Sequence, residues 1–205
     1  MSRKWLLRII FLAGFLLLLY PLISNMVHQR QQSDAVASYD SAVSNRSEEE
    51  IQEILNQATE YNNMLFQSNG AIVDSYNSLL NQANGIMGSI EIPKIDVDLP
   101  IYHGTEVDVL SVGVGHIQGT SLPVGGENTH CVLSGHRGLP GSSLFTRLDE
   151  MKEGDLFFLS VMGETLAYKV YDIQVVDPDN TEVLEITAGK DDVSLVTCTP
   201  YGLNT

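Results

Sequence analysis

The feature that most constrains the fold is a change in the sequence pattern after Gly88, where short apolar runs alternate with turns that contain glycine or proline. The clearest pair is residues 156–161 and 166–176, which are joined by Gly163 and Glu164 in the pattern of a β-hairpin. Many short strands with glycine-rich turns indicate a β-sandwich or a closed β-barrel. We therefore expect this part of the chain to be mainly β.

Residues 193–198 form another candidate strand, because two sets of side chains alternate along Val-Ser-Leu-Val-Thr-Cys with a period of two. Pro200 cannot donate a hydrogen bond to a ladder, so the strand is expected to end just after Cys198. The end of a rigid strand would then present the Cys198 thiol.

A second short strand is expected within residues 129–140, and it ends in a glycine turn that presents His136. A free cysteine thiol is mostly protonated at neutral pH, so a nucleophilic cysteine needs a base or an imidazolium partner. We therefore pair His136 with Cys198 as candidate catalytic residues.

The two stretches resemble the signatures of the sortases, which are surface cysteine transpeptidases of Gram-positive bacteria. The match covers Ser-Gly-His-Arg-Gly around His136 and Leu-Val-Thr-Cys-Thr-Pro-Tyr-Gly around Cys198. Residues 85–95, 99–105 and 115–123 fit the class C, or pilin-polymerising, branch of the family. The resemblance runs from about residue 85 to the end of the chain, with the five motifs in the family's order.

The resemblance implies a sortase-type closed β-barrel with an N-terminal helical extension. Cys198 would attack the Thr–Gly bond of a Leu-Pro-x-Thr-Gly-like sorting signal, and a pilin lysine would resolve the thioester during pilus assembly. His136 would protonate the departing amine and later accept a proton from the attacking amine. Beside the thiol, the substrate groove would be shaped by Ser194, Leu195 and Thr197.

Two other functions stay open. One is a housekeeping sortase that joins proteins to peptidoglycan in the cell wall, which the class C motifs and the N-terminal helices disfavour. The other is a non-catalytic, membrane-anchored binding domain that keeps the groove. A papain-type enzyme is disfavoured because its cysteine precedes its histidine in the chain, whereas here His136 precedes Cys198.

The remaining cysteine and histidines have weaker claims to chemistry. Cys131 lies in the middle of its strand and is expected to be a buried core residue with a free thiol. His103 and His116 are interpreted as local hydrogen-bonding residues. The spacing of His130, Cys131 and His136 is not that of a zinc site, so we expect no metal, and we expect no cofactor.

An arginine is missing from the expected constellation. Sortases place an arginine on the strand that follows the cysteine, where it stabilises the oxyanion. No arginine follows Arg147 here, and Arg137 belongs to the histidine motif. We therefore expect the catalytic arginine and the last barrel strand beyond Thr205, and an impaired enzyme that is a fragment or a disrupted copy.

A candidate lid precedes the barrel. Class C sortases often carry an N-terminal loop whose Asp-Pro-aromatic motif plugs the active site. Here Asp74 and Tyr76 could form the plug, with Ser75 in place of the proline. In the alternative interpretation, Tyr76 belongs to a short helix that leads to residues 79–80, and the lid is missing.

Residues 1–28 predict a membrane element. Arg3, Lys4 and Arg8 precede an apolar run at residues 9–23, and this basic flank would keep the N-terminus inside. A retained single-pass anchor in the cell membrane is favoured over a cleaved signal peptide, because no clear small-x-small cleavage site follows the run. Both alternatives place the domain outside the cytoplasm.

Residues 29–84 are expected to form the helical extension with the candidate lid, and residues 85–205 the barrel domain without its last strand. Ser47 and Glu50 form a capping-box pattern at the start of an amphipathic helix. The apolar face of that helix comprises Ile51, Ile54, Leu55, Ala58, Tyr61 and Leu65. Residues 29–46 are expected to be a stalk or the beginning of a helix.

Charge excludes one class of partner. The 205 residues carry a formal charge of −15, and residues 31–205 alone carry −19. Such a domain repels nucleic acid and anionic lipid headgroups. The expected partners are therefore sorting-signal peptides of pilin or surface proteins, and the membrane through the N-terminal helix, with no nucleic acid.

Overall fold

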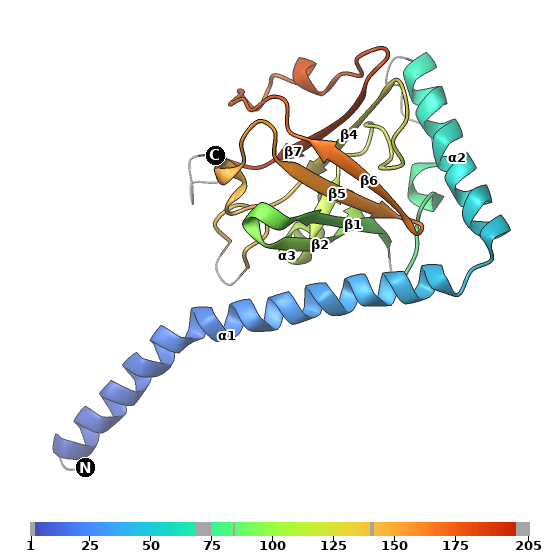
Figure 1. The fold of residues 1–205 in the computed structure, drawn as a ribbon. Helices are drawn as coiled ribbons and strands as arrows, with labels where there is room; N and C mark the ends of the chain where they lie inside the picture. Colours follow the sequence, from blue (N-terminus) through green and yellow to red (C-terminus); the bar gives the residue numbers. More distant parts are fainter. Residues whose placement is uncertain (1–2, 69–74, 84, 140–141, 200–205) are drawn as a thin grey trace.

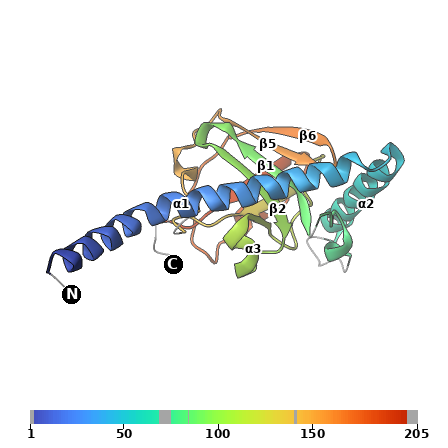
Figure 2. The same ribbon diagram turned by 90° about the horizontal axis from the view of Figure 1, so that it is seen from below.

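Two long helices precede a curled sheet in the computed structural model, which describes residues 3–68, 75–83, 85–139 and 142–199. The helices are α1 (Arg3–Ser44) and α2 (Glu48–Gln67). Behind them, seven strands form one sheet that curls into a nearly closed barrel (Figure 1). The C-terminal half of α1 lies along one side of the barrel, and its N-terminal half extends away from it (Figure 2). The expected mainly β barrel with an N-terminal helical extension is confirmed.

The sheet has the strand order β6-β5-β1-β2-β3-β4-β7. Its neighbours are antiparallel except for the parallel pairs β2–β3 and β4–β7. The strands are β1 (Ile86–Ile92), β2 (Val97–His103), β3 (Val114–His116), β4 (Thr129–Ser134), β5 (Leu156–Val161), β6 (Glu164–Lys169) and β7 (Asp191–Val196). Between β2 and β3 lies the short helix α3 (Val107–Val112).

Helix α2 begins where its capping box predicts. The Ser47 side chain accepts a hydrogen bond from the Glu50 backbone N–H, and the Glu50 side chain accepts one from the Ser47 backbone N–H. Asn62 fastens the helix to the barrel, since its side chain exchanges two hydrogen bonds of 2.7 and 3.1 Å with the backbone of Leu122. Both residues are buried, so the exchange leaves no orphaned polar group at this contact.

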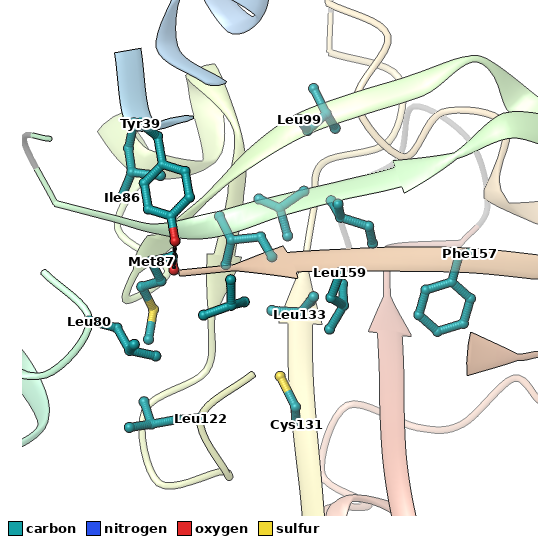
Figure 3. Packing of buried hydrophobic residues seen from close by; sticks show 14 of the residues in the cluster. Tyr39, Leu80, Ile86, Met87, Leu99, Leu122, Cys131, Leu133, Phe157 and Leu159 are labelled. Carbon is teal, nitrogen blue, oxygen red and sulfur yellow. Dashed lines mark hydrogen bonds between the residues drawn. The ribbon is translucent and has the colours of Figure 1, made fainter. Parts of the chain in front are cut away.

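Helix α1 is tied to the barrel by Tyr39. The Tyr39 hydroxyl donates to the carbonyl of Met87 in β1 at 3.1 Å and accepts from the backbone N–H of Met162 at 2.8 Å (Figure 3). Met162 lies in the turn between β5 and β6, so a single side chain joins the helix to two parts of the sheet. Burial raises the pKa of Tyr39 to about 12, so the hydroxyl stays protonated and able to donate at physiological pH.

The core occupies the inside of the curled sheet, with apolar side chains from every strand and from both long helices. Figure 3 shows Cys131 and Leu133 of β4 pointing into this cluster with Leu159 of β5. Cys131 is buried and unpaired, and burial raises the pKa of its thiol, which suits a core residue. The expectation that Cys131 is a core residue is confirmed.

Pro93 begins a 3-10 turn (Pro93–Ile95) that separates β1 from β2. Two boundaries differ from the sequence expectation. Residues 29–44 are helical, which was one of the two alternatives, but they continue α1 without a break after residue 28. The last strand ends at Val196, two residues before Cys198.

The hairpin arm expected at residues 166–176 is also wrong in its extent, because β6 ends at Lys169. Lys169 pairs with Leu156, the first residue of β5, and one further hydrogen bond joins the Val170 N–H to the Asp155 carbonyl at 2.9 Å. The segment after Val170 therefore has no strand opposite it, and the side chains of Tyr171, Ile173 and Val175 are exposed.

The barrel is open between β6 and β7. Within the described residues, neither strand has a ladder partner on its outer edge. Side-chain contacts span the gap at one end, since the Tyr168 hydroxyl donates to the Asp191 carboxylate at 2.9 Å and the Lys190 ammonium lies 5.1 Å from the centre of the Tyr171 ring. Side chains therefore bridge the gap between β6 and β7 at the end where β7 begins.

Candidate active site

The candidate pair lies at the end of the parallel β4–β7 ladder. The register matches Cys131 to Val193 and Ser134 to Val196. Contact between these two segments of the chain continues past the end of both strands, because the Gly135 N–H donates to the Val196 carbonyl at 3.1 Å. The Thr197 hydroxyl then donates to the Gly135 carbonyl at 2.8 Å. One step further in the same register, the positions that fall opposite each other are His136 and Cys198.

Strand parity assigns both positions to the outer face of the barrel. Cys131 and Leu133 face the core, so the side chains between them face outward. Gly135 continues the inner set, since a Cβ there would lie 2.7 Å from the ring of Phe145. If the alternation continues past the ends of the two strands, His136 and Cys198 fall in the outer set, so we expect the imidazole and the thiol on the same face.

The loop behind His136 is held by several hydrogen bonds. The Phe145 N–H donates to the His136 carbonyl at 3.1 Å, and the Gly138 N–H donates to the Thr146 hydroxyl at 3.2 Å. The Arg137 guanidinium forms a 2.6 Å ion pair with Asp149. His136 is half-buried, whereas Cys198 is exposed with a free thiol.

The three expected groove residues do not lie together. Ser194 lies on the outer face, where its hydroxyl is 2.8 Å from the His130 ring. Leu195 lies on the inner face and packs against the core. The Thr197 hydroxyl is engaged by the Gly135 carbonyl, so it joins the ends of the two strands to each other. Of the three, Ser194 alone shares the face of Cys198.

Two apolar residues on the outer face were missed. Val132 pairs with Ser194 and is fully buried, whereas Val196 lies two positions after Ser194 and is half-buried. The period-two alternation would have identified Val196, since it was already assigned to the same set as Cys198. Together, Val132, Ser194 and Val196 form what we call the outer floor.

The His130 ring contacts Ser194 of the outer floor and the backbone of Glu185. Its Nδ1 lies 2.9 Å from the Glu185 carbonyl, which can only accept, so Nδ1 carries the proton in the neutral ring. Its Nε2 then accepts from the Ser194 hydroxyl at 2.8 Å. The segment between β6 and β7 that contains Glu185 is thereby tied to one end of the outer floor, a contact that no sequence pattern predicted.

The candidate lid is only partly within the described residues, because Asp74 lies outside them. Tyr76 belongs to a 3-10 turn (Tyr76–Ser78) and is buried. Its hydroxyl lies 3.0 Å from His116 Nδ1 and accepts from the Gly104 N–H at 3.1 Å. The described hydrogen bonds and ring contacts of Tyr76 involve neither His136 nor Cys198.

His116 and His103 act as local hydrogen-bonding residues, as expected. His116 Nε2 lies 2.8 Å from the Ser121 carbonyl, so Nδ1 of the neutral ring accepts from Tyr76. His103 Nε2 lies 2.7 Å from the Leu79 carbonyl. The two histidines thus fasten the segment that contains Tyr76 to β2 and β3.

The burial of His116 predicts acid sensitivity. Desolvation lowers its pKa from 6.5 to about 4, so below pH 6.5 the unfolded chain binds a proton that the folded chain resists. Stability present above pH 6.5 should therefore fall as the pH drops towards 4, by an amount on the order of 3 kcal/mol. Urea unfolding at a series of pH values measures this loss. His116→Gln should flatten this part of the profile, and an unchanged profile would contradict the assignment.

No metal site accompanies the pair. In the part of the chain that the structure describes, no group of three or more histidine, cysteine, aspartate or glutamate side chains is arranged to hold a metal ion.

Comparison with known proteins agrees with this architecture. The Sortase domain family matches residues 90–205. Sortase C1 from Streptococcus agalactiae superposes with a TM-score of 0.80 at 45% identity, covering 84% of this chain and 93% of that one. Sortase C from Clostridium perfringens, solved with the C-terminal cell wall sorting motif, has a TM-score of 0.74 at 43% identity, covering 84% and 93%. The chain belongs to the sortase family, and these structural neighbours are class C sortases.

A curated relative lies further away. Sortase D from Bacillus subtilis is 36% identical over 127 residues, which cover 62% of this chain and 60% of that protein. The matched part of the chain thus spans less than two thirds of this relative's length.

Proposed function

We propose that this chain is a class C-type sortase transpeptidase in which Cys198 is the nucleophile and His136 is its acid–base partner. The observation that supports the proposal is the β4–β7 register, which ends at the Ser134–Val196 pair and is followed by hydrogen bonds of Gly135 with Val196 and Thr197. Extended by two residues, this register would put His136 opposite Cys198. The exposed thiol and the half-buried imidazole suit a nucleophile that peptide can reach and a base held in place behind it.

The reaction would proceed in two transfers. The Cys198 sulfur attacks the carbonyl carbon of the threonine in the sorting signal, and the Thr–Gly carbon–nitrogen bond breaks. His136 delivers the proton that the departing glycine amine needs. In the second transfer a lysine amine attacks the thioester, its proton passes to His136, and the carbon–sulfur bond breaks to restore Cys198.

The outer floor supports a substrate with small and apolar side chains ahead of the scissile bond. Val196 is half-buried and offers a small apolar side chain on the approach to Cys198, Val132 is fully buried, and the Ser194 hydroxyl is already engaged by His130. A Leu-Pro-x-Thr-Gly-like signal has this composition. The Clostridium perfringens sortase C was solved with a cell wall sorting motif, which favours the same class of substrate here. The attacking amine would be a pilin lysine, as in pilus assembly.

The location proposed for the enzyme is the outer side of the cell membrane. α1 is long and apolar enough to cross a bilayer by length and composition, although this criterion alone is weak. The basic residues Arg3, Lys4 and Arg8 at its start would keep the N-terminus inside. The barrel would then face out, where sorting signals and pilins meet it.

The proposal is tested by incubating the full chain in detergent with a Leu-Pro-x-Thr-Gly peptide and a lysine-containing pilin peptide. Mass spectrometry should find Cys198 carrying the peptide up to its threonine, and then the isopeptide product. A faster reaction with oligoglycine than with lysine would indicate a housekeeping sortase. Peptide binding without any acylation of Cys198 would identify a binding domain and overturn the proposal.

A further inference from the structure

Helix α1 contacts the barrel at several positions along its C-terminal half. Gln32 donates from its side chain to the Val112 carbonyl at 3.2 Å and to the Ser142 hydroxyl at 3.5 Å. Tyr39, two turns later, bonds to β1 and to the β5–β6 turn. Val43 lies against Gly163 in that same turn, where a Cβ would lie 3.7 Å from the valine methyl.

If α1 crosses a membrane, the positions of these contacts along the helix give the height of each contact above the membrane surface. The exposed large apolar side chains of α1 end at Val27, and the one proline inside the helix, Pro21, lies before this point, so residues 28–44 continue as a helix without a proline into the docked part. At 1.5 Å per residue, Gln32 lies about 7–8 Å beyond Val27 along the helix, and Val43 lies about 24 Å beyond it. The barrel is therefore fixed to the helix with one end low and the other high.

The low end is the one that carries the candidate active site. Ser142 is buried beneath Gln32 and follows His136 in the same loop, which is closed by the bond between the His136 carbonyl and the Phe145 N–H. In Figure 1, β7 ends on the side of the barrel towards which the N-terminal half of α1 extends.

We propose that α1 is a rigid strut that holds the His136–Cys198 end of the barrel against the lipid surface, so that the groove takes sorting peptides presented at the level of the headgroups. This inference rests on the proposed function, in which α1 crosses the membrane. It adds an interaction surface, the membrane-facing residues 136–139 and 142–147, and a condition on the substrate: its scissile bond lies within one or two helical turns of the bilayer.

Rigidity, and not attraction, would hold this end down. Residues 31–205 carry a formal charge of −19, which repels anionic headgroups over roughly the Debye length of 8–10 Å at physiological salt. A barrel on a flexible joint would drift away from an anionic bilayer. A barrel docked on a continuous helix cannot do so without bending the helix or breaking the contacts of Gln32 and Tyr39.

The test measures height by energy transfer. The full chain carrying Cys198→Ala is reconstituted into phosphatidylcholine–phosphatidylglycerol vesicles whose headgroups carry an acceptor dye. A donor dye is attached either at S143C, beside the Gln32 contact, or at E164C, beside the Val43 contact; both positions are exposed, and Cys131 is buried. The two contact levels differ by about 16 Å along the helix, so transfer should be several-fold greater from position 143.

Two matched insertions after His28 distinguish a strut from a tether. Seven helix-forming residues add two turns and keep the docked face in line, so transfer from both positions should fall while their difference persists. Seven Gly-Ser residues break the helix, so the difference should disappear and transfer should fall further at low salt. A difference that survives the Gly-Ser insertion would overturn the strut.

Failure of this inference can be told apart from failure of the proposed function. Equal transfer from positions 143 and 164 in vesicle-bound chain would overturn the strut and leave the cysteine chemistry untouched. Chain that does not float with the vesicles would overturn both the strut and the membrane anchor. Peptide acylation of Cys198 in detergent is measured separately and depends on neither.

Discussion

Replacing Cys198 with alanine should abolish acylation by a sorting peptide, with the chain still folded. The side chain is exposed at the end of β7, so its loss removes few contacts, while the reaction loses the only atom that forms the covalent bond. Loss of a covalent nucleophile costs a factor of about a thousand or more in turnover. The measurement is labelling of the intact protein by a Leu-Pro-x-Thr peptide that carries a thiol-reactive group, followed by mass spectrometry.

The matched control is Cys131→Val, which replaces the second thiol with an apolar side chain of similar size. Cys131 is buried on the opposite face of the sheet, so this variant should keep its labelling and lose less than about 1.5 kcal/mol of stability. Labelling that survives Cys198→Ala and disappears with Cys131→Val would show that the roles of the two cysteines are reversed.

A second large effect is expected from a chain extended beyond Thr205 by a further strand that carries an arginine. The outer edges of β6 and β7 are unpaired within the described residues, and Tyr171, Ile173 and Val175 are exposed with the period of a strand. A strand between the two edges would cover these groups, limit aggregation through open edges, and bring an oxyanion donor towards Cys198. One such donor is worth about a hundredfold to a thousandfold in turnover.

Comparing the chain of 205 residues with the extended chain tests this expectation through the rate of peptide cleavage and the soluble yield. Replacing the added arginine with alanine should keep the yield and lose the gain in rate. Equal rates for the two chains, with cleavage that depends on Cys198, would show that the oxyanion is stabilised by another group.

The sequence predicted the elements whose signals are local. The capping box predicted the start of α2, the glycine turn before His136 predicted the end of the strand that carries Cys131, and period-two alternation predicted the strand before Cys198. It also assigned Leu195 and Cys198 to opposite faces, yet we placed Leu195 in the groove. That placement followed the residue's proximity to the thiol in the chain, whereas burial on the inner face depends on the parity of the strand.

The contacts that position the site could not be predicted in the same way. These contacts join residues that are about 60 positions apart in the sequence. They are the pairing of β4 with β7, the hydrogen bonds between Asn62 and Leu122, and the hydrogen bonds of His130. Such contacts depend on how the whole sheet curls, and no short stretch of sequence predicts that curl. The continuity of α1 was missed for a related reason, because polar residues 29–44 are helical while docked on the barrel.

The central claim is that His136 and Cys198 lie opposite each other on one face, and a disulfide between these two positions tests it most directly. Neighbouring strands lie about 4.8 Å apart, and a disulfide needs Cα atoms roughly 4.4–6.8 Å apart with side chains on the same side. His136→Cys should therefore form a bridge to Cys198 under mild oxidation, which non-reducing peptide mapping detects. Arg137→Cys, one residue out of register, should not. A folded His136→Cys variant whose two thiols stay free, or a bridge that forms from position 137 instead, would contradict the account.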